Sequence, residues 1–247
     1  CSKTVGNWIS ISPSLGSVNW EGTFDGNGHT ISNLYVNSTY QNSGMFDQTG
    51  NCCIKNITFT GVNITGDMFT GLVRNLYGTV KNVTVADGTI TGKEYVGSIC
   101  ASSDGIIENC TNYATVKSTG YCVGGITGTQ KGGHISNCAN HGNVEASYHV
   151  GGIVGAIYGE ATNLSNVIST GNIIETSNSQ TCGMVVGQVN ATLTLSDYAI
   201  FSSDASMTCQ ETPLTPRGIG SANNLNDITG KTVGYTTVQI ESGMATY

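Results

Sequence analysis

Small and apolar residues recur along the chain in one order, about every 27 residues. The segment 150–155 reads VGGIVG, and the segment 123–128 reads VGGITG. Aligning the copies gives a column of glycines that are 27, 26, 27, 27 and 32 residues apart. This column consists of Gly44, Gly71, Gly97, Gly124, Gly151 and Gly183. An internal repeat of this length is typical of solenoid proteins.

A second column with the same period contains asparagine. It lies in the segments ISNL, IKNI, VKNV, IENC, ISNC and LSNV, and a seventh copy, LSDY, places Asp197 there. Its members are Asn33, Asn56, Asn82, Asn109, Asn137 and Asn166. Two columns with one period identify a true internal repeat.

Each repeat contains short β-branched runs separated by Gly, Asn, Asp or Ser, as in TVKNVTVADGTITG at 79–92. No segment sustains the i, i+3, i+4, i+7 spacing of an amphipathic helix. Two or three short strands per repeat fit one coil of a β-solenoid, whose coils stack at about 4.8 Å. The sequence therefore predicts an all-β fold, a right-handed parallel β-helix of about seven coils with terminal caps. The handedness follows the general prevalence of right-handed β-helices.

The two columns are predicted to form two corners of each coil. In ISNL, the residue two before Asn and the residue after it are both apolar, although strict alternation would point them to opposite faces. A bend at Asn lets both point inward, because Asn tolerates the left-handed backbone conformation. The Asn side chains can then bond to one another as a ladder. Glycine permits the tight bend of the second corner.

The period divides the chain into three parts. Residues 1–24 fit the repeat poorly and are predicted to be an N-terminal cap or first strands, because a solenoid must cover its open end. Residues 25–200 form the β-helix. Residues 201–247, where the period is lost, are predicted to be a C-terminal loop and a cap or a linker to a further domain. We also expect other domains in the same longer chain.

Charge and composition limit the partners. Only 10% of the residues are charged, and the formal net charge is −7. The 9 basic residues are scattered, which gives no electrostatic footprint for a nucleic acid and disfavours an anionic membrane surface. No apolar run reaches the roughly 18 residues of a membrane-spanning helix, so direct membrane insertion is not predicted.

A search for catalytic carboxylates finds one candidate pair. Glu145 and Glu175 are expected on adjacent coils, in one column with Lys117. Glycoside hydrolysis needs two carboxylates about 5–10 Å apart. A charge ladder explains this column more simply, because opposite charges on adjacent strands stabilise the pairing. No catalytic residue is therefore predicted.

Metal and thiol sites are also not predicted. No two of the 4 histidines share neighbouring positions with a third ligand, and the 9 cysteines contain no CxxC pair. We expect no cofactor, with a Ca²⁺ ion held by scattered oxygens as an alternative that the sequence does not place. Cys110, Cys138 and Cys182 are expected to be buried apolar residues. The alternative for the first two is a disulfide between adjacent coils.

The sharpest candidate site is a row of tyrosines. Tyr95, Tyr121 and Tyr148 lie two or three places before the corner glycines of three successive coils. Such a row can face solvent and contact a glycan or a protein, or it can cover the corner as apolar packing. Apolar packing is the simpler interpretation, and a ligand-binding strip is the sharpest site hypothesis that the sequence offers.

Several motifs resemble the GLUG-type repeat of bacterial surface proteins, namely GGITG, GGIVG, TGLVRN and CGMVVG. WEGTFDGNGHTISNLYVN looks like the coil that commonly precedes these repeats, and GKTVGYTTVQIESGMATY is similar to a segment that often follows them in large gut-bacterial proteins. The resemblance covers about residues 20–200. It implies a β-solenoid in a secreted or cell-surface protein, often assigned to adhesion, and brings no catalytic residues with it.

These observations predict a non-enzymatic extracellular or cell-surface module, of bacterial origin. It would act as an adhesin that binds a host or dietary glycan or a surface protein, or as a rigid spacer. The alternative is a carbohydrate-active β-helix enzyme, either a polysaccharide lyase or a glycoside hydrolase. A cleft lined by converging carboxylates would distinguish the enzyme.

Overall fold

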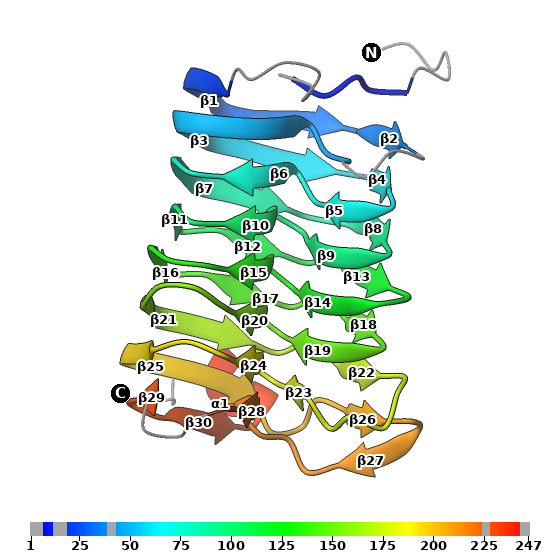
Figure 1. The fold of residues 1–247 in the computed structure, drawn as a ribbon, viewed down its shortest axis with the longest axis vertical. Helices are drawn as coiled ribbons and strands as arrows, with labels where there is room; N and C mark the ends of the chain where they lie inside the picture. The colour runs from blue at the N-terminus through cyan, green and yellow to red at the C-terminus, as the bar shows by residue number, and fades with distance from the viewer. Residues whose placement is uncertain (1–6, 12–18, 39–42, 224–227, 243–247) are drawn as a thin grey trace.

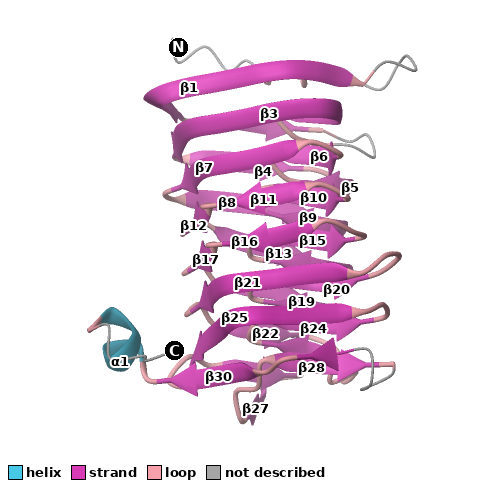
Figure 2. Cartoon of the chain, turned by 90° about the vertical axis from the view of Figure 1, so that its left-hand side faces the viewer, coloured by secondary structure: helices cyan, strands magenta, loops and turns pink. Residues whose placement is uncertain are grey.

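The chain winds as a parallel β-solenoid whose coils stack along one long axis (Figure 1). The computed structural model describes residues 7–11, 19–38, 43–223 and 228–242. These residues complete about six turns of the solenoid, which confirms the predicted all-β parallel architecture. Within the described ranges, α-helix is limited to α1 (Thr237–Glu241), which projects sideways from the last coil (Figure 2).

Each coil passes through four strand positions, which we call stacks A, B, C and D. One full coil runs through β6 (Val73–Leu76), β7 (Thr79–Val85), β8 (Gly88–Gly92) and β9 (Glu94–Gly97), in that order of stacks. The 17-stranded sheet contains stacks A and B, because the long strand β3 belongs to both. The 8-stranded and 5-stranded sheets are stacks C and D.

The strands of stacks A and B follow one another along the axis. In addition to β6, stack A contains β10 (Cys100–Ser103), β15 (Thr127–Gln130), β20 (Val154–Ile157), β24 (Val186–Val189) and β28 (Ile219–Ala222). In addition to β7, stack B contains β1 (Trp20–Ser32), β3 (Phe46–Thr60), β11 (Ile106–Glu108), β12 (Thr111–Asn112), β16 (His134–Ser136), β17 (Ala139–Asn140), β21 (Thr162–Ser169), β25 (Leu193–Ser202), β29 (Ile228–Thr229) and β30 (Thr232–Tyr235).

Stacks C and D consist of shorter strands. In addition to β8, stack C contains β2 (Tyr35–Asn37), β4 (Val62–Thr65), β13 (Thr115–Ser118), β18 (Val144–Ala146), β22 (Ile173–Glu175), β26 (Met207–Cys209) and β27 (Thr212–Leu214). In addition to β9, stack D contains β5 (Met68–Thr70), β14 (Tyr121–Gly124), β19 (Tyr148–Gly151) and β23 (Cys182–Gly183). The stacked pairs are parallel, and β26 with β27 forms an antiparallel pair at the end of stack C.

The core is a set of apolar columns at the repeat period. Ile99, Ile126 and Ile153 come from three successive coils and are all 0% exposed. Burying each such side chain stabilises the fold by roughly 1.5–3 kcal/mol. Because each coil buries its apolar residues against the next coil, the repeat in the sequence becomes a continuous core.

The asparagine corner lies within stack B. Asn82 has a φ of 54° and Asn109 has a φ of 52°, both in the left-handed region. The Asn82 amide donates to Asn56 Oδ1 at 2.8 Å, and the Asn109 amide donates to Asn82 Oδ1 at 3.1 Å. The amide of Asn166 donates to Asn137 Oδ1 at 3.0 Å in the same way. These side chains form a hydrogen-bonded ladder along the solenoid.

Asn33 does not belong to this ladder, so its assignment to the column was wrong. The strand β1 shifts register between Asp25 and His29, which moves ISNL away from the level of IKNI. Asp25 Oδ1 therefore accepts the Asn56 amide at 3.0 Å in the first coil. Asn33, with a φ of 57°, instead lies opposite Gly61, whose φ is 58°.

The glycine corner joins stack D to stack A. At Gly124, a Cβ atom would lie 2.0 Å from the carbonyl oxygen of Thr127, and at Gly97 it would lie 2.2 Å from that of Cys100. No side chain fits at this distance, because the chain folds back directly on itself. Gly124 pairs with Gly97 and Gly151, so each coil repeats the same bend.

The solenoid continues beyond residue 200, where the boundary of the repeats was predicted. Val186 in β24 pairs with Ile219 in β28, and Ile200 in β25 pairs with Val233 in β30. The loop between these partners lengthens, which hides the period in the sequence. Residues 201–247 therefore include strands of a further coil, and part of the predicted 1–24 cap lies outside the described residues.

Candidate functional site

Five side chains of stack D form a continuous row, which we call the aromatic strip. Its members are Phe69, Tyr95, Tyr121, Tyr148 and His149. The ring centroids are 4.7 Å apart for the first pair, then 5.1 Å, 5.3 Å and 4.9 Å along the row. All five side chains are half-buried. The three tyrosines singled out from the sequence therefore lie in contact, in a longer row.

The row is set by the register of stack D. Tyr121 pairs with Tyr148 across adjacent coils. Tyr95 lies one position nearer to its glycine, at a corner where the backbone is left-handed, with a φ of 53°. Phe69 and His149 share this corner, with φ values of 47° and 54°. A bulky residue in the left-handed region is uncommon, and such residues are concentrated at functional sites.

The orientation of the rings limits what the strip can bind. Phe69 stacks on Tyr95 with an interplanar angle of 8°, and Tyr121 stacks on Tyr148 with an angle of 11°. The faces of these rings are therefore turned toward one another along the axis. The edges and hydroxyl groups remain for contact with a partner, and the Tyr95 and Tyr121 hydroxyls are 3.0 Å apart.

One phenol of the strip, that of Tyr121, stays protonated at neutral pH. The hydrogen bond with Tyr95, followed by burial and by the nearby Glu94 carboxylate, raises the pKa of Tyr121 far above its usual value. Burial lowers the pKa of His149, so its imidazole is neutral at pH 7. An aromatic row with the Glu94 carboxylate at its border is suited to a partner with apolar and hydrogen-bonding groups.

Three polar side chains meet at one end of the strip, and one of them is its last member, His149. Cys122 Sγ lies 3.5 Å from His149 Nδ1 and 3.6 Å from Tyr158 Oη, and the latter two atoms are 3.5 Å apart. Cys122 is 0% exposed, and burial raises the pKa of its thiol to about 12. Burial also raises the pKa of Tyr158. The thiol is therefore protonated at pH 7 and is not a ready nucleophile.

The sequence analysis missed this pairing of Cys122 with His149. Both residues lie two places before a corner glycine, Gly124 or Gly151, so the repeat itself places them on adjacent coils. This spacing was a usable signal. Tyr158 follows β20 and approaches from stack A, and nothing in its sequence position indicates the contact.

The candidate carboxylate pair is not assembled. Glu145 pairs with Lys117 at 2.8 Å, as the charge ladder predicted. Glu175 was wrongly placed in that column, because β18 and β22 pair Glu145 with Ile174 and Ala146 with Glu175. Glu175 is fully buried, and its carboxylate accepts from the backbone amides of Ser179 at 2.9 Å and Gln180 at 2.8 Å. It supports a turn.

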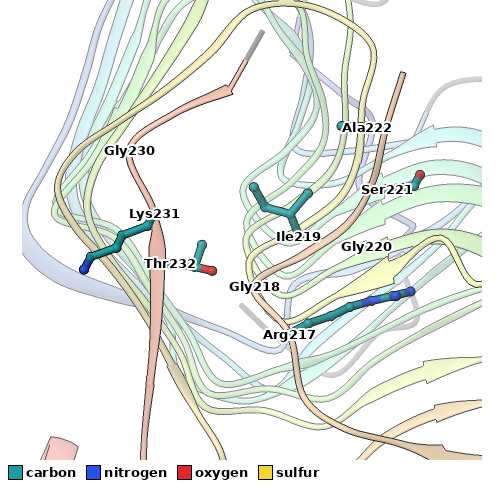
Figure 3. A pocket seen from close by; sticks show the side chains of 9 residues that line it. All are labelled: Arg217, Gly218, Ile219, Gly220, Ser221, Ala222, Gly230, Lys231 and Thr232. Atoms are coloured by element: carbon teal, nitrogen blue, oxygen red, sulfur yellow. The ribbon is translucent and has the colours of Figure 1, made fainter. Parts of the chain in front are cut away.

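A hollow of about 490 Å³ lies where β28 and the segment 230–232 diverge in the last coil (Figure 3). Ile219 and Thr232 point between the two segments, whereas Arg217 and Lys231 point away. Arg217 donates to the carbonyl of Gln180 at 2.7 Å. None of the nine residues that line the hollow is a carboxylate or a thiol, so it offers no acid–base pair.

Other described cysteines also have a cysteine or a carboxylate beside them, as Cys110 has Cys138 and Cys209 has Glu175. The eight cysteines in the described part of the chain are free thiols, and Cys110 and Cys138 each donate to a carbonyl two residues earlier, at 3.2 Å. Among the described residues, no group of three His, Cys, Asp or Glu side chains converges. No described helix is long and apolar enough to cross a membrane.

Comparison with known proteins finds similarity in fold and over one short segment. No family model matches the chain. A segment of 90 residues, 34% of this chain, is 40% identical to halomucin from Haloquadratum walsbyi, and it spans 1% of that protein's length. The fold is similar to the crystal structure of a "putative immunoglobulin A1 protease" from Bacteroides ovatus. The TM-score is 0.81 at 21% identity, over 97% of this chain and 76% of the other.

Proposed function

We propose that this chain is a non-enzymatic cell-surface module that binds an extracellular partner through the aromatic strip. The observation that carries the proposal is the continuity of the strip, which extends over four successive coils of a rigid solenoid. A solenoid suits adhesion because its stacked coils present equivalent positions as one extended surface. The GLUG-type motifs and the match to a segment of halomucin support a location at the cell surface.

The ring geometry favours a protein partner over a glycan. A sugar that stacks on an aromatic residue needs a free ring face, and the stacked pairs of the strip cover most of these faces. Ring edges and tyrosine hydroxyls, by contrast, are the groups that tyrosine-rich protein interfaces use for contact and hydrogen bonding. A glycan held by hydrogen bonds to the hydroxyls and to Glu94 is the second candidate.

The carbohydrate-active enzyme has less support. Its two candidate carboxylates have separate structural roles, one in an ion pair with Lys117 and the other inside a turn. The fold of the similar solved structure does not alter this conclusion, because its identity of 21% transfers the fold alone. A turnover assay on any glycan that the domain retains would test the enzyme directly.

Retention on a panel of immobilised host surface proteins, mucins and glycans tests the proposal. We expect retention on a protein, and we expect the double variant Tyr121→Ala/Tyr148→Ala to lose at least about 10-fold in affinity, since interface tyrosines often contribute 1 kcal/mol or more each. Tyr113→Ala is the matched control, because Tyr113 is 52% exposed and stacks on His141 away from the strip.

The outcomes separate the candidates. Retention on glycans alone, lost in the double variant, would support the second candidate. Retention that survives the double variant would contradict any role of the strip in binding. No retention of the folded protein at high concentration would favour a rigid spacer that displays neighbouring domains.

A further inference from the structure

We propose that Cys122, His149 and Tyr158 form a binding site for one Zn²⁺-like divalent transition-metal ion. The three side chains present sulfur, nitrogen and oxygen donors that surround one point between two adjacent coils. The site shares His149 with the aromatic strip, but metal binding there does not depend on the function proposed for the strip.

The spacing of the three donors matches the face of a metal tetrahedron. Zn²⁺ lies about 2.3 Å from thiolate sulfur and about 2.0–2.2 Å from nitrogen or oxygen ligands. A tetrahedral arrangement at these lengths separates the donor atoms by about 3.4–3.6 Å. The observed edges, between Sγ and Nδ1, Sγ and Oη, and Oη and Nδ1, are 3.5, 3.6 and 3.5 Å. All three edges therefore agree with one bound ion.

Hydrogen bonding explains the two distances to sulfur but explains the third distance less well. The Tyr158 Oη to His149 Nδ1 separation is 3.5 Å, which is longer than the 2.7–3.2 Å or so of an N···O hydrogen bond. Cys122 Sγ is within sulfur hydrogen-bond distance of both other atoms, whereas the imidazole nitrogen and the phenol oxygen have no close contact with each other. A metal ion would contact all three donor atoms at once.

The backbone holds the donors in place before an ion arrives. Cys122 and His149 occupy equivalent left-handed corners, with φ values of 59° and 54°, so their side chains leave adjacent coils in the same direction. The ring of Tyr148 stands edge-on to the His149 ring, at 4.9 Å and 89°. Such surrounding contacts orient metal ligands and tune their affinity.

Binding would replace the thiol proton of Cys122 with the metal, so that a sulfur–metal bond forms as the S–H bond breaks and one proton is released to solvent. His149 would bind through the lone pair of neutral Nδ1, and its proton would then lie on Nε2. Tyr158 would bind through its phenol oxygen. A water molecule would take the fourth position of the tetrahedron. No oxidant or reductant is involved.

Titration with Co²⁺, followed by absorption spectroscopy, tests the site in the intact chain. Tetrahedral Co²⁺ with a thiolate ligand gives strong visible d–d bands and a sulfur-to-cobalt charge-transfer band in the near ultraviolet. We expect one Co²⁺ per chain, displaced by Zn²⁺. We expect Cys122→Ser to remove the charge-transfer band, and His149→Gln and Tyr158→Phe each to weaken binding by about 10-fold or more.

The variants keep the proposal testable even if one of them fails to fold. Glutamine tolerates the left-handed backbone in this region, because Gln180, one position earlier relative to its glycine in the next coil, has a φ of 55°. Tyr158→Phe removes one oxygen only. Cys138→Ser is the matched control, since Cys138 is also buried but has Cys110 rather than an imidazole beside it. A charge-transfer band that persists in Cys122→Ser, or that disappears in Cys138→Ser, would overturn the proposal, as would no Co²⁺ uptake by the unaltered protein.

Discussion

Two corners of this solenoid use the same backbone conformation with different side chains. At the asparagine corner of stack B, Asn56, Asn82 and Asn109 have φ values of 52–56° and bond to one another. At the corner of stack D, Tyr95 and Cys122 have φ values of 53° and 59°. Both corners are left-handed, but only the first repeats one residue type.

The difference indicates what each corner is for. A left-handed residue other than Gly or Asn costs roughly 1–2 kcal/mol. Asparagine reduces this cost and adds a hydrogen bond to the next coil, so the first corner is a structural solution. The second corner retains Phe69, Tyr95, Cys122 and His149 despite the cost. Side chains kept in an unfavourable conformation point to contact with something outside the chain, which is the role proposed for the strip.

The largest expected effect comes from the turn that precedes β23, the last strand of stack D. Glu175→Ala removes a buried carboxylate that accepts two backbone amides, one of them from Gln180. Leaving these donors without a partner should lower the free energy of unfolding by about 3 kcal/mol. Equilibrium unfolding in denaturant measures this loss in the free energy of unfolding. Glu145→Ala is the control, since Glu145 is partly exposed and its ion pair with Lys117 should contribute about 0.5 kcal/mol.

A smaller loss is expected at the first corner. Asn82→Ala removes the hydrogen bond that Asn82 donates to Asn56 and the one that it accepts from Asn109. It also leaves a residue in the left-handed region whose side chain forms no hydrogen bond. The free energy of unfolding should fall by about 2 kcal/mol. Asn82→Gly keeps the backbone conformation accessible but removes the amide, so it separates the two contributions. If the Ala variant is as stable as the unaltered protein, the ladder bonds do not contribute to stability and only accompany the bend.

The smallest change in stability is expected from exchanging the residue types of the two corners. Tyr95→Asn loses ring contacts with Phe69 and Tyr121 but gains a residue that prefers the left-handed conformation. These effects oppose one another, so the melting temperature should shift by a few degrees at most, corresponding to less than about 1 kcal/mol. Binding to the partner should nevertheless weaken. A large loss of stability would show that Tyr95 is packing, and the comparison of the corners would lose its functional meaning.

The candidate site was only partly predictable. The row of Tyr95, Tyr121 and Tyr148 follows from the period, because equal positions in adjacent coils must lie about 4.8 Å apart. The pairing of Cys122 with His149 follows from the same spacing. Ring orientation does not, since it depends on how each side chain packs against its neighbours. Asn33 was misplaced because the register shift in β1 cannot be seen in the ISNL motif itself. Glu175 was misplaced because the pairing of β18 with β22 puts Ile174, one residue earlier, opposite Glu145.

The sequence by itself determined the period, the parallel stacking of coils, the asparagine bend and the glycine bend. These features are local and repeated, so each copy adds evidence for the others. The tertiary structure alone decided that β28 and β30 continue the solenoid, that the ring faces of the strip cover one another, and that Tyr158 reaches the thiol of Cys122. These contacts join segments outside the period, and the direction of a side chain between two stacks depends on the packing of both.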